Sequence, residues 1–195
     1  LCIHMAQGLK FRVLLDSESK EEVFRDILVP EDQNFEVFYH SIMKAFSFSG
    51  DQMASFYVSN DQWDKGHEIS LMDMSYDDDS VDELCNVMQK AIIKDFVSES
   101  DQKFILVYDF MKMWIFLIEL IGREPMEESV PKIVLNVGTP PLESSKQDLE
   151  EDMFRSGGGA LSSGLDEDDE HDYGFNDYGD DYDDEDLSGY NEYEY

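Results

Sequence analysis

The chain has 195 residues, a formal net charge of −32 and only two cysteines. Its length suffices for one domain with a core. Its charge argues against direct binding to nucleic-acid phosphate or to an anionic membrane surface, because both depend on Lys and Arg. Cys2 and Cys85 form no CxxC pair, and the first residues lack the features of a signal peptide. We therefore expect a cytoplasmic protein with reduced thiols.

The first 50 residues predict two strands and a helix. Residues 9–15 alternate between apolar and polar side chains, and residues 23–29 form a second apolar run that ends at Pro30. A helix is expected over about 34–47, because Asn34 is a suitable N-cap and Gly50 lies just beyond the end. Its apolar face is formed by Phe35, Phe38, Ile42, Ala45 and Phe46.

The middle of the chain predicts two short strands and a second, short helix. The strands are expected over residues 53–58 and 68–72. Ser80 and Glu83 fit a capping box, and apolar residues recur at helical spacing from Val81 to Ile92. These features indicate the second helix.

The most apolar stretch, residues 104–122, predicts a β-hairpin. It is nominally long enough to cross a bilayer, but it contains Asp109, Lys112 and Glu119. Each central charge in a membrane helix costs about 2.5–3.5 kcal/mol, which excludes that reading. β-Branched and aromatic residues favour two strands, with the Trp114 face in the core and a turn around residues 110–113. This turn lacks Gly and Asn, so we expect a longer, irregular connection.

The last part of the chain predicts an edge strand and then a disordered acidic tail. Residues 133–137 form the short apolar run of the strand. From Pro141 to Tyr195 there are 20 acidic and two basic residues, and a Gly/Ser-rich stretch resembles a flexible linker. We expect an N-terminal extension over residues 1–8, a domain over 9–142 and the tail over 143–195.

The sequence contains no recognisable catalytic, cofactor or metal motif. The four histidines have no spacing typical of metal ligands. A Gly-rich phosphate loop and a G-x-S-x-G elbow are both missing. We therefore expect no catalytic residue, no cofactor and no metal.

Two blocks, residues 23–56 and 104–120, carry a pattern that resembles the plasmid Ri open-reading-frame-three-like family, whose members include insertion-element passenger proteins. In the first block the matching positions are Phe24, Arg25, Val29, Pro30, Phe35, Phe38, Ile42, Ala45 and Phe56. In the second they are Tyr108, Asp109, Phe110 and Trp114. The Pro140–Pro141 pair also stands where the family often has one, and the acidic tail resembles the Bacteroidetes branch. The resemblance implies an α+β fold with a mostly antiparallel sheet and a link to mobile elements, without an established activity.

The chain departs from this family at polar positions. Where the family often has histidine, the chain has Tyr39, Gln52, Ala54 and Phe116. The Gly-Asp of the family's turn is Met111-Lys112. If the family has a histidine-dependent activity, we expect this member to lack it.

Taken together, these patterns predict a non-catalytic protein-interaction module. Its partners are expected to be basic proteins, bound through the acidic tail. The candidate interaction or motif residues are Arg25, Trp63, Tyr108, Asp109 and Trp114. For Asp109 we expect hydrogen bonds from the amides of the turn. Two alternatives stay open, a DNA-mimicking acidic protein and an enzyme of unknown class with a degenerate site, and the sequence leaves the oligomeric state open.

Overall fold

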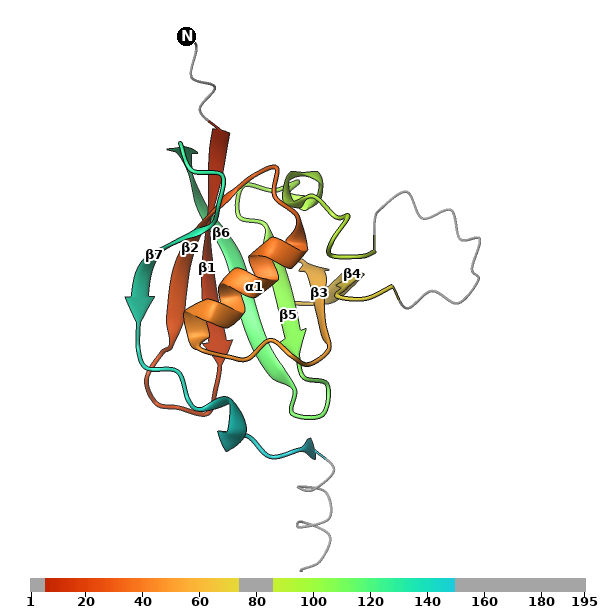
Figure 1. The fold of residues 1–195 in the computed structure, drawn as a ribbon, viewed down its shortest axis with the longest axis vertical. Coiled ribbons are helices and arrows are strands. Elements are labelled where there is room, and N and C mark those ends of the chain that lie inside the picture. The colour runs from red at the N-terminus through yellow and green to blue at the C-terminus, as the bar shows by residue number, and fades with distance from the viewer. Residues whose placement is uncertain (1–5, 74–85, 150–195) are drawn as a thin grey trace, which may run out of the picture. The chain divides into compact units, whose positions relative to one another are not determined.

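The structure is a computed structural model that describes residues 6–73 and 86–149. All of these belong to the first of the two units into which the chain divides, Leu1–Ala160. The described residues form one seven-stranded sheet of antiparallel neighbours and one α-helix that lies across a face of the sheet (Figure 1). The predicted α+β fold class is confirmed.

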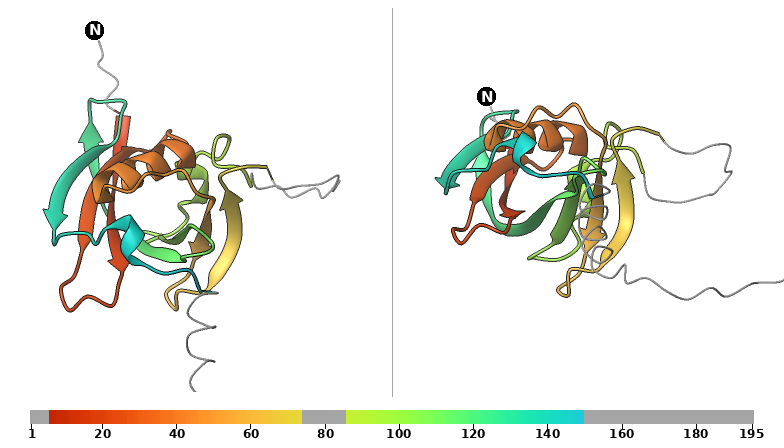
Figure 2. Two further views of the ribbon diagram at one scale, coloured as in Figure 1. Left: turned by 60° about the horizontal axis from the view of Figure 1, so that its bottom comes forward. Right: turned by 90° about the horizontal axis from the view of Figure 1, so that it is seen from below.

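The strand order across the sheet is β4-β3-β5-β6-β1-β2-β7. The strand bounds are β1 Ala6–Asp16, β2 Phe24–Pro30, β3 Ala54–Ser59, β4 Lys65–Ser70, β5 Lys103–Tyr108, β6 Trp114–Met126 and β7 Lys132–Val137. The helix is α1 Phe35–Phe46, and two 3-10 helices are η1 Ile93–Phe96 and η2 Glu143–Ser145. The sheet curves around the side on which α1 lies (Figure 2).

The predicted central hairpin is formed by β5 and β6. Their register runs from Lys103 opposite Glu119 to Tyr108 opposite Trp114. Alternate residues of β6 are buried, as the period-2 pattern predicts: Trp114, Phe116, Ile118 and Leu120. The predicted edge strand is also present, because β7 pairs only with β2 at the end of the sheet.

The core is a layer of aromatic side chains between α1 and the sheet. Phe35 and Phe38 of the helix contact Phe56 on β3 with ring centres 5.0 and 5.8 Å apart, and Phe46 contacts Phe116 on β6 at 5.0 Å. The predicted N-cap is confirmed, since Asn34 accepts a bond from the Val37 amide at 2.9 Å. The helix ends at Phe46, close to the predicted end, and its C-cap is Ser47, which adopts a left-handed conformation with φ of 60°.

The predicted second helix differs from what the structure shows. Residues 80–85 of that prediction lie outside the described residues, and residues 86–92 form a turn and two isolated bridges. The Ser70 amide bonds to the Asn86 carbonyl at 2.8 Å, and the Met88 amide bonds to the Ser70 carbonyl at 2.9 Å. These bonds hold the backbone away from a helical path, and the short helical turn that follows is η1.

Several other boundaries are shifted, and β6 continues beyond the predicted hairpin to Met126. β1 begins at Ala6, which pairs with Met126, and so it includes residues assigned to the N-terminal extension. β4 begins at Lys65 rather than at residue 68. The described chain continues past 142 through η2 to residue 149, whereas the remaining residues of the predicted tail lie outside the described part. Within residues 6–73 and 86–149, no helix is both long and apolar enough to span a bilayer.

Candidate functional site

Three of the five candidate residues meet at one end of the central hairpin. Tyr108 ends β5, Trp114 begins β6 opposite it, and Asp109 is the first residue of the turn between them. All three are buried. The second family-like block therefore marks one physical location, the end of the hairpin.

Asp109 organises the hairpin turn. Its backbone is left-handed, with φ of 56°, and its Oδ1 atom accepts bonds from the amides of Met111 and Lys112 at 3.0 and 3.2 Å. Asp tolerates this conformation better than most residues because its short side chain bonds locally. Met113 is also left-handed, with φ of 54°. The connection is thus irregular and contains no glycine. As expected, Asp109 accepts hydrogen bonds from the amides of the turn.

The hydroxyl of Tyr108 is the centre of a polar cluster. It donates to the Glu143 carboxylate at 2.6 Å and accepts from the Gly50 amide at 3.1 Å. The Ser49 hydroxyl lies 3.1 Å away, and an Asp51 oxygen lies at 3.4 Å. Burial, followed by the bond to Glu143, raises the pKa of Tyr108 to about 12. We call these five residues the Tyr108 cluster.

A second tyrosine lies beside this cluster without joining it. Tyr39 on α1 is fully buried, its ring centre is 6.3 Å from that of Tyr108, and its hydroxyl has no hydrogen-bond partner among residues 6–73 and 86–149. Burial raises the pKa of Tyr39. Tyr39, Ala54 and Phe116 are fully buried, and they occupy three of the four positions at which the resemblance expects histidine. The fourth, Gln52, lines a surface groove.

This groove, which we call the α1 groove, has a volume of about 710 Å³. It lies between the first half of α1, the segment before β3, the end of β4 and the turn at residues 87–90. Its carboxylates are Glu36, Asp51 and Asp73, and its apolar side chains are Met53, Leu71, Met72 and Val87. Two basic side chains, His40 and Lys90, also line it. The groove therefore combines negative charge with adaptable methionine side chains.

Asp51 connects the α1 groove to the Tyr108 cluster. Its Oδ1 atom accepts bonds from the Ser49 hydroxyl at 2.7 Å and from the Gln52 amide at 3.2 Å. The bond from Ser49 is the main reason why the pKa of Asp51 is lowered. Asp51 consequently keeps its negative charge in the groove even in mildly acidic solution.

Arg25 has a structural position, since its donors reach backbone carbonyls. Its guanidinium bonds to the carbonyls of Ala45 in α1, Val137 in β7 and Gly138, at 3.1, 2.7 and 3.2 Å. It also lies over the Phe46 ring at 5.0 Å. Burial lowers the pKa of Arg25. Arg25 joins the end of the helix to the edge of the sheet.

Trp114 packs between the core and the C-terminal segment. Its ring centre lies 4.9 Å from that of Phe48. The ammonium group of Lys146 lies 5.2 Å from the centre of the indole ring. The predicted core position of Trp114 is confirmed, with 3% of the residue exposed.

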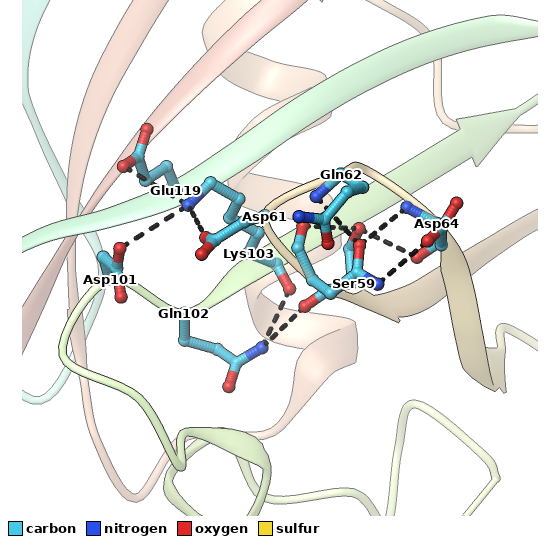
Figure 3. A network of polar contacts seen from close by, with 9 residues as sticks. Ser59, Asp61, Gln62, Asp64, Asp101, Gln102, Lys103 and Glu119 are labelled. Carbon is cyan, nitrogen blue, oxygen red and sulfur yellow. Dashed lines mark hydrogen bonds and ion pairs between the residues drawn. The ribbon is translucent and has the colours of Figure 1, made fainter.

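Trp63 lies far from the other four candidates, in the turn between β3 and β4. There the ammonium group of Lys103 lies 5.9 Å from the centre of the Trp63 ring. Lys103 also reaches three carboxylates, Asp61, Asp101 and Glu119, at 2.8, 3.7 and 3.8 Å (Figure 3). Next to this network the Gln102 amide donates to the Ser59 carbonyl at 3.2 Å (Figure 3). These contacts join the turn to β5 and β6, so we assign Trp63 and Lys103 to stabilisation of that end of the sheet.

Sequence reasoning missed most of the Tyr108 cluster. Ser49 and Asp51 follow the helix in a segment without a motif, and Glu143 was assigned to the tail. Composition carries no signal for these contacts, because Glu143 is 35 residues from Tyr108 in the chain. No set of three or more His, Cys, Asp or Glu residues in the described segments is arranged to hold a metal ion.

Comparisons with known proteins agree with this fold. A family model described as "Plasmid pRiA4b ORF-3-like protein" matches residues 7–189. The crystal structure of a protein of unknown function from Methanosarcina mazei Go1 is similar, with a TM-score of 0.59 and 17% identity, over 77% of this chain and 81% of that chain. No curated protein matches the sequence.

Proposed function

We propose that this chain, which belongs to the plasmid pRiA4b ORF-3-like family, is a non-catalytic protein-interaction module that binds basic polypeptide segments. The description of the family supports a link to plasmids. The α1 groove supports the binding role, because three carboxylates and four apolar side chains line it. Lysine and arginine side chains match such a surface, with charged ends for the carboxylates and apolar stems for the methionines.

The net charge of the whole chain favours the same class of partner. The chain has 46 acidic and 14 basic residues, and residues 150–195 alone contain 18 acidic residues and a single arginine. A negative field of this size attracts a basic partner and raises its association rate, more strongly at low salt. In this proposal residues 150–195 supply long-range attraction, and the α1 groove supplies specific contacts.

Calorimetric titration with hexaarginine, with hexaglutamate as the negative control, tests this function. We expect salt-sensitive binding of hexaarginine and none of hexaglutamate. The double variant Glu36→Gln, Asp51→Asn removes two charges from the groove and should weaken binding about tenfold, since each charged contact contributes about 0.5–1 kcal/mol. The matched control is Glu99→Gln, Glu127→Gln, which removes two exposed charges outside the groove.

The comparison between the two double variants decides the role of the groove. Equal losses of affinity would show that only net charge matters, and would overturn the groove as the binding site. A chain that ends at Leu149 separates the tail from the body. If that chain no longer binds hexaarginine, the body has no site of its own.

A further inference from the structure

A second cavity, which we call the Trp114 cavity, lies where β6 begins. Its volume is about 570 Å³. One wall comes from the end of β1 and the turn after it, and another from the C-terminal segment that follows Pro140. Trp114 lies between these walls. None of the residues that line the α1 groove lines this cavity.

The chain places one of its own lysines in the Trp114 cavity. The ammonium group of Lys146 lies 5.2 Å from the centre of the Trp114 ring and donates to the Met113 carbonyl at 2.5 Å. An aromatic face and a carbonyl are both favourable neighbours for an alkylammonium group. The occupied position therefore shows which chemistry the cavity accepts.

Two carboxylates and the indole N–H of this cavity have no partner within the described residues. The carboxylates of Asp16 and Glu18 line it, and neither forms an ion pair with Lys146. The indole N–H of Trp114 is buried and has no acceptor. A buried donor without an acceptor is costly. A basic polypeptide offers a cationic side chain for the two carboxylates.

We infer that the Trp114 cavity binds a lysine or arginine side chain of a basic polypeptide, and that Lys146 occupies this position until the partner displaces it. The inference rests on the class of partner named in the proposed function, but it assigns a separate site. Lys146 acts as an internal competitor. Removal of the Lys146 side chain should then increase the affinity for a basic polypeptide. This increase should exceed the one that follows from the loss of a single positive charge elsewhere in the chain.

The fluorescence of Trp114 provides a direct measurement. The chain has two tryptophans, so the variant Trp63→Phe leaves Trp114 as the reporter. Titration with hexalysine should change the emission of Trp114. In this background we expect Lys146→Ala to bind hexalysine about fivefold more tightly than Lys112→Ala does, in line with the strength of one cation–π contact. Lys112→Ala is the matched control, because it removes the same charge from the adjacent turn.

Two results would overturn the inference. The first is equal affinity of Lys146→Ala and Lys112→Ala for hexalysine. The second is a calorimetric heat of hexalysine binding without any change in the emission of Trp114. That result would mean that hexalysine binds elsewhere, for example in the α1 groove, and not in the Trp114 cavity. Absence of both heat and emission change would overturn the proposed function as well. The variant Asp16→Asn, Glu18→Gln should lower affinity, and unchanged affinity would also count against the cavity.

Discussion

Two buried tyrosines in this protein differ by their hydrogen bonds. The hydroxyl of Tyr108 is bonded to Glu143, Ser49 and Gly50, whereas the hydroxyl of Tyr39 has no partner in the described part of the chain. Removal of a bonded hydroxyl loses stabilising contacts, but removal of an unbonded one costs little or even stabilises. The same substitution should therefore have opposite consequences at the two positions.

We expect Tyr108→Phe to lower the free energy of unfolding by about 1–3 kcal/mol at pH 7. Tyr39→Phe should leave it unchanged or raise it. Because the folded pKa of Tyr108 is about 12 and that of an unfolded tyrosine about 10, its contribution is complete below pH 10 and is lost as the pH rises toward 12. Urea unfolding at pH 7, 10 and 11 measures both effects. Equal losses in the two variants would contradict the role of the Tyr108 cluster.

At this scale the sequence predicts local contacts better than distant ones. The bonds of Asp109 follow from residue type and the adjoining turn, so they were predictable. The hydrogen bonds of Glu143 were not predictable, because this residue precedes a strongly acidic segment. Its partners, Tyr108 and Ser49, lie 35 and 94 residues earlier in the chain. Charge density suggested disorder there, but one tyrosine and one serine fix Glu143 in place.

Among the secondary-structure elements, Arg25 connects α1 and β7, which are far apart in the sequence. Its guanidinium bonds at once to the end of α1 and to the end of β7. Four backbone carbonyls receive its hydrogen bonds, counting that of Phe24. A lysine has a compact ammonium group and cannot reach the same set in this planar arrangement.

Arg25→Lys should lower the free energy of unfolding by about 1–3 kcal/mol, because some of these buried carbonyls lose their partner. The control is Arg123→Lys, an exposed arginine on β6, for which we expect a change within about 0.5 kcal/mol. Chemical denaturation followed by circular dichroism measures both. If Arg25→Lys is as stable as the control, the guanidinium does not hold the helix to the edge strand.

Elements with strong periodicity were predicted, and those shaped by distant contacts were not. The helix and the central hairpin follow from spacing and β-branched residues. The second helix was predicted from a run that includes Met88 and Ile92. Met88 is buried because its segment crosses the start of α1. There the Glu36 amide donates to the Met88 carbonyl, and the Phe35 amide donates to the Ala91 carbonyl. The apolar residues of this buried turn happen to recur at helical spacing, so the pattern alone does not distinguish the turn from a helix.

For the whole molecule the dominant property is its charge. A net charge of −32 destabilises a folded chain through repulsion among its own carboxylates. Salt screens this repulsion, since the Debye length falls from about 30 Å at 0.01 M to about 3 Å at 1 M. We expect the free energy of unfolding to rise between 20 mM and 0.5 M NaCl.

The chain that ends at Leu149 provides the comparison. It lacks 18 of the 46 acidic residues, and its stability should depend less on salt. Urea unfolding at both salt concentrations measures this difference. A full-length chain whose stability falls with salt would show that attractive ion pairs, such as those of Lys103, outweigh the repulsion.

The bonds between Ser70 and residues 86–88 have a consequence for how the family can diverge. They fasten the two ends of the intervening stretch to each other. The entropy of closing a loop grows slowly with its length, by about 0.6 kcal/mol for each doubling. Residues can therefore be inserted between Asp73 and Asn86 at a small cost in free energy, while Leu71, Met72 and Asp73 still line the α1 groove. Under the proposed function, such insertions are a route to a different partner that leaves the sheet and α1 unchanged.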